Sequence, residues 1–264
     1  MNPELDFLIT IAKQAGVMAL KLQTEDLQIA YKGRADLVTK ADKALEAYLL
    51  SEIHGKFPSH SIYAEETGEH SGSLEHRWYV DPIDGTTNYA HGMPFYCISV
   101  GYACEGKLTL GVIYCPTLDE CFAAESGQGA WLNGKRIQVS RIEKIEDAML
   151  ETGFRQRLFN TPKTNMPNFI RLSGEAQSVR RLGSAALGLA YVAAGRLDGF
   201  WEIAGNPWDV AAGVLLVREA GGLAEPLYEG GKLLTGSVDI LASNPSLFPE
   251  LREIFKEEKQ KLLL

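Results

Sequence analysis

The sequence predicts an α/β protein in which helices are interleaved with a largely antiparallel sheet. Three observations lead to this class. Apolar residues recur with a helical period near the start of the chain, strand-like runs separated by turn dipeptides fill residues 95–140, and strands alternate with helices after residue 148. No internal repeat, low-complexity tract or flexible linker is visible. We therefore expect a single domain over 1–264, with a larger α+β half at 1–143 and a smaller α/β half at 144–264.

The N-terminal region predicts two helices joined by a loop. Asn2-Pro3 is a typical cap and first turn, and apolar residues from Leu5 to Leu22 then follow the period of about 3.6 residues. Residues 32–36, Lys-Gly-Arg-Ala-Asp, predict a loop. A second helix should begin near Thr39, because apolar residues with helical spacing follow it.

The middle of the chain predicts strands. Residues 61–64 and 77–80 form short apolar runs that each lead into acidic residues. Four further runs are separated by turn dipeptides such as Glu105-Gly106 and Asn133-Gly134, a pattern that favours an antiparallel meander over βαβ units. These four runs cover 96–103, 108–114, 121–124 and 130–132.

The remaining segments alternate between strand and helix. We expect strands at 148–152, 178–181, 197–203, 222–225 and 239–242. We expect helices at 168–177, 184–194 and 207–220, and a last helix from Pro245. The helix at 184–194 is rich in glycine and alanine and lies in an uncharged run too short to span a bilayer, so it should pack inside the protein.

The composition is that of a globular protein with a sizeable core, since 45% of the residues are hydrophobic and 23% are charged. The net charge of −8 argues against non-specific binding to nucleic acid or to an anionic membrane, because such binding needs a surplus of lysine and arginine. It leaves an anionic small-molecule substrate open, since metal cations can offset the local field.

The chain start and the cysteines predict a reduced, cytoplasmic protein. Glu4 and Asp6 stand where a signal peptide would have a basic start and an apolar core. The cysteines have no CxxC spacing and lie in strand-like segments, so we expect reduced core thiols and no zinc site. They are Cys97, Cys104, Cys115 and Cys121.

The stretch DPIDGTTNY at 81–89 is the most informative motif. Asp81 and Asp84 follow an expected strand, and Gly85-Thr-Thr-Asn has the composition of a helix start. Glycine lets the backbone approach a ligand closely, and a helix N-terminus favours an anion. The backbone amides of this helix start therefore suit a phosphate.

Two further acids stand at comparable places. Glu65 ends a short strand, and Asp209 falls in the first turn of a proline-initiated helix. If both converge with Asp81 and Asp84, about four negative charges share one pocket and need a hard divalent cation such as magnesium. Two or more ions sharing Asp81 would form a two-metal phosphoryl-transfer site. Taken alone, Glu65 or Asp209 would be read as an ordinary surface acid.

These motifs resemble the two signatures of the inositol monophosphatase family, part of a superfamily of magnesium-dependent, lithium-sensitive phosphatases. The first is Asp81-Pro-Ile-Asp-Gly-Thr-Thr-Asn88 and the second is Trp208-Asp209-Val-Ala-Ala-Gly213. The resemblance covers nearly the whole chain, and weaker matches occur in the expected order. They are Asp36-Leu-Val-Thr39 with Asp42, Glu65-Glu66, Gly183-Ser-Ala-Ala186 and Glu202.

The resemblance implies a set of metal ligands and catalytic residues. Two or three magnesium ions would be bound by Glu65, Asp81, the carbonyl of Ile83, Asp84 and Asp209. One ion would take Glu65, Asp81 and Ile83, and a second would take Asp81, Asp84 and Asp209. Glu65 would help to hold a third. Thr86 would orient the attacking water, and Asp42 would share the proton network of that water.

The resemblance also implies the substrate contacts. Gly85 and Thr86 would hold the phosphate. The residues that would contact the rest of the bound substrate are Ser184, Ala185, Glu202 and Asp209. The implied fold is a layered α/β/α/β/α sandwich of the sugar phosphatase type with mixed, largely antiparallel sheets, and the implied assembly is a homodimer.

The implied reaction is magnesium-dependent hydrolysis of a phosphate monoester by metal-activated water, with inositol 1-phosphate as the leading substrate. Fructose 1,6-bisphosphate, a nucleotide 3'-phosphate and histidinol phosphate are alternatives within the superfamily. A mainly non-catalytic, protein-binding role is the alternative from a different class. Cationic residues bear on this choice: the loop from Lys32 to Arg34 could close over a phosphate or be solvated, and arginines at 154–181 could contact a second phosphate. These are Arg155, Arg157, Arg171, Arg180 and Arg181.

Overall fold

The computed structural model describes residues 2–25, 27–33 and 36–261. Its helices are α1 (Pro3–Gln23), α2 (Lys40–Lys56), α3 (Thr86–Ala90), α4 (Met166–Glu175), α5 (Ala185–Ala193), α6 (Pro207–Glu219) and α7 (Phe248–Lys261). Short 3₁₀ helices lie at Ile145–Asp147 and Gln156–Leu158. The strands before residue 105 are β1 (Ala30–Gly33), β2 (Asp36–Val38), β3 (His60–Ala64), β4 (Gly68–His70), β5 (Ser73–Asp84) and β6 (Cys97–Cys104). The later strands are β7 (Lys107–Cys115), β8 (Glu120–Glu125), β9 (Gly129–Leu132), β10 (Lys135–Arg136), β11 (Met149–Thr152), β12 (Ser178–Arg180), β13 (Gly199–Gly205), β14 (Leu223–Pro226) and β15 (Val238–Ser243).

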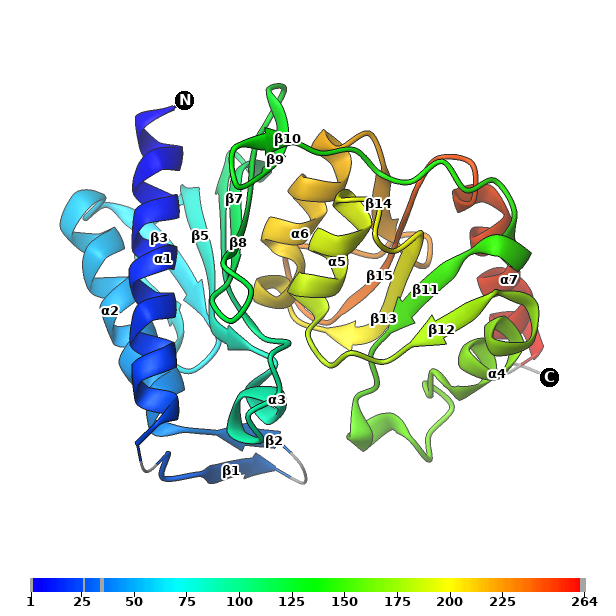
Figure 1. Cartoon of the computed structure of the whole chain (residues 1–264), viewed down its shortest axis with the longest axis horizontal. Coiled ribbons are helices and arrows are strands. Elements are labelled where there is room, and N and C mark those ends of the chain that lie inside the picture. The colour runs from blue at the N-terminus through cyan, green and yellow to red at the C-terminus, as the bar shows by residue number, and fades with distance from the viewer. Residues whose placement is uncertain (1, 26, 34–35, 262–264) are drawn as a thin grey trace.

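The helices and the two larger sheets stack in five layers (Figure 1). α1 and α2 cover one face of a sheet with the strand order β10-β9-β8-β7-β6-β5-β3-β4, and α5 and α6 cover its other face. A second sheet, of order β12-β11-β13-β15-β14, follows, and α4 and α7 cover its outer face. The expected α/β/α/β/α sandwich is confirmed. The pairing is mixed, since β3 with β5 and β11 with both β12 and β13 are parallel.

Each helical layer buries its own apolar core. Leu45 and Trp78 belong to the core between the α1–α2 layer and the first sheet. Leu189 and Val214 belong to the core between the two sheets, and Trp201 belongs to the core under α4 and α7. The middle layer is packed from both sides, which explains why α5 and α6 consist so largely of small apolar residues.

Close packing of α6 against the first sheet holds the start of this helix in place. A β-carbon added to Gly101 on β6 would lie 2.9 Å from the β-carbon of Ala211, closer than two carbon atoms can pack. Glycine therefore permits the helix to approach the strand at this level. Asp209 lies two residues before Ala211, so this contact fixes the height at which its carboxylate stands above the sheet.

The predicted helices and strands are confirmed, with shifts of a few residues at their ends. The predicted loop at 32–36 is wrong for Lys32, Gly33 and Asp36, which belong to the antiparallel strands Ala30–Gly33 and Asp36–Val38. Arg34 and Ala35 lie outside the described residues, so the idea that this segment closes over a phosphate stays a prediction. All four cysteines are free thiols, as expected. Within the described residues, no helix is long and apolar enough to cross a membrane.

Candidate active site

Two of the predicted acids leave the first sheet side by side. β3 and β5 are parallel neighbours, and Ala64 is paired with Val80, so Glu65 and Asp81 follow at the same edge. The pairing continues one step further, because the amide of Glu65 donates to the carbonyl of Val80 at 3.1 Å. The Asp81 side chain is buried and hydrogen-bonded to the Glu65 carboxyl, and its Oδ1 also accepts from the amide of Ile83 at 3.0 Å.

Asp84 is held by the N-terminus of α5. The β5–β6 ladder is irregular between Asp81 and Asp84. Oδ2 of Asp84 accepts hydrogen bonds from the Ser184 hydroxyl at 2.7 Å and from the Ala186 amide at 2.6 Å. The Gly183-Ser-Ala-Ala segment thus contacts a candidate metal ligand directly, beside its implied contact with substrate.

Asp209 comes from the first turn of α6, in the middle layer. It completes a capping box, accepting hydrogen bonds at Oδ2 from the amide of Asn206 at 2.9 Å and from its side chain at 3.2 Å. The guanidinium of Arg155 also donates to Oδ2 of Asp209. The same guanidinium lies 3.0 Å from Oε1 of Glu202 on β13, so one arginine joins two of the predicted site acids.

The pKa values show that these acids interact. Burial raises the pKa of Asp81 well above its ordinary value, and the charges of Glu65, Asp84 and Asp209 raise it further. Burial raises the pKa of Asp84 to about 8, with Asp209 and Glu202 adding to the shift and the bonds from α5 opposing it. Four predicted acids from three separate segments therefore lie in one electrostatic cluster, which we name the acid cluster: Glu65, Asp81, Asp84 and Asp209.

A second set of hydrogen bonds positions the Thr86 hydroxyl beside the acid cluster. Thr86 Oγ1 lies 3.0 Å from Oδ1 of Asp42 and 3.1 Å from the carbonyl oxygen of Ile83. The other oxygen of Asp42 accepts from the amide and the hydroxyl of Thr39, at 2.7 and 2.6 Å, in the capping box that begins α2. Asp42 is fully buried, so its place is fixed by these contacts.

Gly85 forms the turn between β5 and α3. Its φ angle is +99°, a left-handed conformation that favours glycine. An added β-carbon would lie 3.1 Å from the carbonyl oxygen of Phe95 and 3.2 Å from that of Gly183. The residue type is therefore required here by both conformation and space, as expected for a backbone that closely approaches a ligand.

The donor chemistry of the acid cluster fits a hard divalent cation. Its donors are carboxylate oxygens together with the carbonyl of Ile83. The pKa values of Asp81 and Asp84 are raised in part by neighbouring carboxylates, so a cation would relieve this repulsion. In the described part of the chain, no three His, Cys, Asp or Glu side chains close around one point as a ready metal-ligand group. Asp84 is instead hydrogen-bonded to the start of α5, and Asp209 is paired with Arg155.

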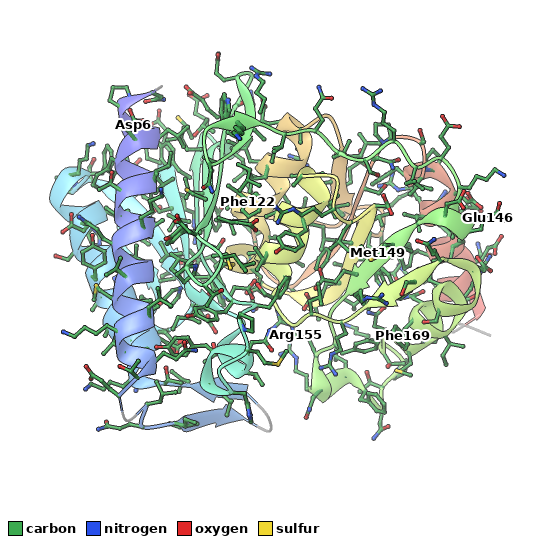
Figure 2. All side chains as sticks on the ribbon, in the orientation of Figure 1. Asp6, Phe122, Glu146, Met149, Arg155 and Phe169 are labelled. Atoms are coloured by element: carbon green, nitrogen blue, oxygen red, sulfur yellow. The ribbon has the colours of Figure 1, made fainter. Side chains whose placement is uncertain are left out.

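Three of the arginines considered as contacts for a second phosphate lie in different surroundings; Figure 2 labels Arg155. Arg155 contacts the acid cluster, and the Arg181 guanidinium lies 5.4 Å from the ring centre of Phe154. Arg171 is instead on α4, in the outer layer, where it forms ion pairs with carboxylates of α4 and α7. Arg171 is therefore not available to a substrate at the acid cluster, whereas Arg155 is paired with Asp209 and the charge of Arg181 acts on Glu202.

Sequence reasoning did not single out two buried acids near the site. Glu46 lies on α2, four residues after Asp42, and accepts hydrogen bonds from the turn that follows Glu65. Glu151 on β11 accepts from the amide of Leu182 at 3.3 Å, and burial raises its pKa well above the ordinary value. The helical spacing of Glu46 and Asp42 was the available signal. No comparable pattern marks Glu151.

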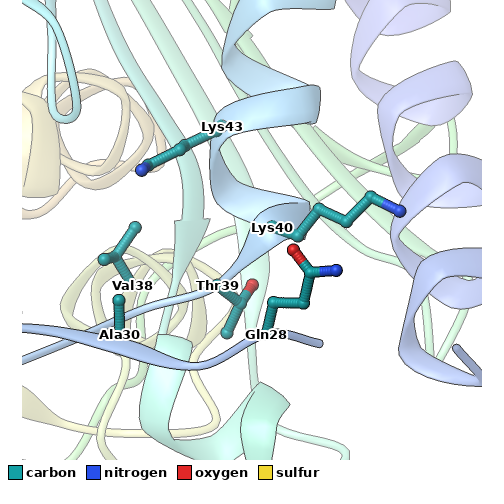
Figure 3. A pocket seen from close by; sticks show the side chains of 6 residues that line it. All are labelled: Gln28, Ala30, Val38, Thr39, Lys40 and Lys43. Atoms are coloured by element: carbon teal, nitrogen blue, oxygen red, sulfur yellow. The ribbon is translucent and has the colours of Figure 1, made fainter. Parts of the chain in front are cut away.

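A pocket of about 160 Å³ lies beside the hydrogen-bond network of Thr39, Asp42 and Thr86 but outside the acid cluster (Figure 3). Thr39 and two lysines, Lys40 and Lys43, line it together with apolar and amide side chains of the β1–β2 hairpin region. Its charged groups are ammonium groups, so it is not a second place for a metal cation. Thr39 connects it to Asp42, at the edge of the water-orienting network.

Comparison with known proteins identifies the family of the chain. The structure is similar to extragenic suppressor protein suhB from Bartonella henselae (38% identity, TM-score 0.90, 96% of this chain and 98% of that chain). It is also similar to inositol monophosphatase from Anabaena (40% identity, TM-score 0.85, 96% and 95% covered). Curated relatives include Nus factor SuhB of Escherichia coli (40% identity, 98% and 97% covered) and inositol-1-monophosphatase of Synechocystis (43% identity, 90% and 84% covered). The model of the inositol monophosphatase family matches residues 1–260, and the chain belongs to that family.

Proposed function

We propose that the protein is a magnesium-dependent phosphatase that hydrolyses inositol 1-phosphate to inositol and phosphate. The observation that carries this proposal is the acid cluster, in which carboxylates from β5, α6 and the end of β3 act on one another's ionisation beside the Gly85 turn. The name of the Synechocystis relative and family membership support the same activity. We also propose a homodimer, which light scattering would test.

The proposed metal ligands are carboxylates and one carbonyl. Glu65, Asp81 and the Ile83 carbonyl would hold one magnesium ion, and Asp81 would share a second with Asp84 and Asp209. Glu65 would help to hold a third. When bound, magnesium supplies Lewis-acid polarisation of the phosphate and of the attacking water, and neutralises charge on the leaving alcohol.

The Thr86–Asp42 pair would orient the attacking water. The Thr86 hydroxyl directs its proton to Asp42 Oδ1 or to the Ile83 carbonyl, so its oxygen is free to accept a hydrogen bond from water. Asp42 in turn is fixed by Thr39, which keeps the hydroxyl from rotating. In this arrangement the chain places the water, and the proton lost by the water enters a network that is already ordered.

The substrate would be held from two layers. The backbone at Gly85 and Thr86 would contact the phosphate, and Ser184, Ala185 and Glu202 would contact the hydroxyls of the polyol. Glu202 is buried and paired with Arg155, which gives the site one acceptor and one donor group for hydroxyls. A neutral polyol with several hydroxyls matches such alternating groups.

A pocket lined by aromatic side chains favours a second candidate substrate, a nucleotide 3'-phosphate. Phe154, Phe159 and Phe169 line a pocket of about 460 Å³, and Arg181 stands at its wall. Figure 2 shows Arg155 toward the middle of the molecule and Phe169 farther out on α4. Aromatic rings suit a nucleobase, and the arginine suits a second phosphate.

Phosphate release from a small substrate panel tests both candidates. The panel is inositol 1-phosphate, fructose 1,6-bisphosphate, histidinol phosphate and 3'-phosphoadenosine 5'-phosphate, each with magnesium and with or without lithium. A lithium-sensitive preference for inositol 1-phosphate is expected. A preference for either bisphosphate would move the substrate assignment to the pocket with Arg181. No release from any member would contradict the phosphatase proposal.

The curated name of several relatives supports a second role. Proteins called Nus factor SuhB are 40% identical to this chain over 98% of its length. A protein-binding role is therefore the candidate from a different class. Capture of a stoichiometric partner that survives Asp84→Asn would support it, because that change is expected to stop catalysis without altering the surface.

A further inference from the structure

Helix α2 carries two fully buried acids one turn apart. Asp42 and Glu46 are 0% and 1% exposed, and their spacing of four residues places them on the same face of the helix. Asp42 contacts Thr86, at the start of α3. Glu46 contacts a different segment, the turn between β3 and β4. One helix face therefore reaches both sides of the proposed site.

Both oxygens of Glu46 are used on that turn. Oε2 accepts a hydrogen bond from the amide of Glu66 at 2.8 Å, and Oε1 accepts from the amide of Thr67 at 2.9 Å and from its hydroxyl at 2.7 Å. Hydrogen bonds from neutral donors to a carboxylate are stronger than those between neutral groups. A buried carboxylate with these donors fixes the backbone immediately after Glu65.

Glu65 is thereby held from both sides. Its own amide donates to the Val80 carbonyl of β5, and the next two residues are bound to Glu46. The carboxyl of Glu65 is hydrogen-bonded to Asp81 across the same edge. The position of the Glu65 carboxyl relative to Asp81 therefore depends on α2 as well as on the sheet.

We propose that Glu46 is a positioning residue for the magnesium site: through the Glu66 and Thr67 amides it fixes the Glu65 carboxylate beside Asp81. This inference rests on the proposed function. Both carboxylate oxygens of Glu46 bind the turn, so Glu46 would act on metal affinity through Glu65 and not on the chemical step at saturating metal. Groups that orient metal ligands commonly change affinity by about 10–100-fold when they are replaced.

Glu46→Gln tests the proposal with little change in volume. In the glutamine side chain an NH2 group replaces one carboxylate oxygen. This group cannot accept a hydrogen bond from an N–H group of the turn, so one hydrogen bond is lost. Calorimetric titration with magnesium chloride alone should show affinity weakened by about tenfold. The kcat for inositol 1-phosphate at saturating magnesium should stay within about threefold of the original protein.

Glu219→Gln is the matched control. Glu219 also binds a turn through two amides, accepting from Gly127 and Gly129 at 2.8 Å each, but it lies at the opposite end of α6 from Asp209. This variant should lose thermal stability with unchanged magnesium affinity. Equal weakening in both variants would overturn the proposal, because the effect would then be a general loss of stability.

Glu46→Asp gives an independent measurement if the glutamine variant does not fold. It keeps the charge and both acceptor oxygens on a shorter side chain, so magnesium affinity should fall less than in Glu46→Gln. Affinity within about twofold of the original protein in the folded variants would overturn the positioning role. Absence of magnesium binding by the original protein would instead overturn the proposed function, so the two failures are distinguishable.

Discussion

At the scale of single residues, the candidate site contains carboxylate side chains that hydrogen bonds from neighbouring residues hold in place. Asp84 is oriented by Ser184 and Ala186, and Asp42 by Thr39. Such contacts hold a side chain in one rotamer before a ligand arrives. Because these side chains are already in position, we expect the proposed reaction to depend on the negative charge of the carboxylates more than on the shape of the side chains.

Asp84→Asn removes one of these charges and keeps the shape. Asparagine can still accept the hydrogen bonds from Ser184 and Ala186, so the fold should be retained. Turnover of inositol 1-phosphate should fall by roughly 100-fold or more, since a ligand of the proposed second ion is lost. Steady-state kinetics with saturating magnesium measure this loss.

The control for this variant is Glu146→Gln, the same chemical change on an exposed side chain paired only with Lys144 among the ion pairs of the described residues. Its turnover should match that of the original protein. Near-normal turnover of Asp84→Asn would show that the acid cluster does not carry the reaction.

At the scale of elements, the candidate site depends on the points where strands end and helices begin. β5 carries Asp81 and Asp84 and passes into α3, Glu65 follows β3 in the turn before β4, and Asp209 lies in the first turn of α6. The β5–α3 junction is the tightest of these, because Gly85 has a positive φ and backbone oxygens on two sides.

Gly85→Ala tests this junction. The left-handed conformation costs an alanine about 1–2 kcal/mol, and the added β-carbon crowds the carbonyl oxygens of Phe95 and Gly183. Turnover and thermal stability should both fall. Gly106 also has a positive φ, of +72°, but the space around an added β-carbon is open there. Gly106→Ala is therefore the control that isolates the conformational cost. If turnover fell equally in both variants, a close approach of backbone to phosphate at Gly85 would be contradicted.

At the scale of the whole molecule, the buried acids link stability to pH and to metal. The pKa of Asp84 is raised to about 8 and that of Asp81 is raised by the same burial, so without metal the folded state binds protons that the unfolded state has released. The stabilising contribution of Asp84 is complete below about pH 4 and is lost as the pH rises through about 8, and that of Asp81 is likewise lost as the pH rises.

Magnesium should therefore stabilise the protein more at higher pH. It replaces protons at these carboxylates, so the increase in Tm that it causes should grow between pH 6 and about pH 8. Scanning calorimetry with and without magnesium measures the increment. In Asp84→Asn the growth should be smaller. An increment that stayed constant or shrank across this range would contradict the linkage.

Much of the fold and the acid cluster could be predicted from sequence because each depends on local pattern. The meander from β6 to β9 has clear turn dipeptides, and α1 and α2 have caps and a regular apolar period. The β1–β2 hairpin and β4 were missed because these short strands contain many polar residues and glycine, and so show neither an apolar run nor an alternating pattern. Glu46 was missed since its role depends on how α2 approaches the end of β3.

The arrangement of the layers also predicts when the proposed magnesium ions would bind during folding. Glu65, Asp81 and Asp84 all leave the first sheet, whereas Asp209 lies in the first turn of a helix packed between the sheets, and Glu202 belongs to the second sheet. A nascent chain whose first sheet has formed would hold three of the carboxylates and lack the fourth. Completion of the second ion's site then reports that the sandwich has closed, so tight magnesium uptake should be among the last events of folding.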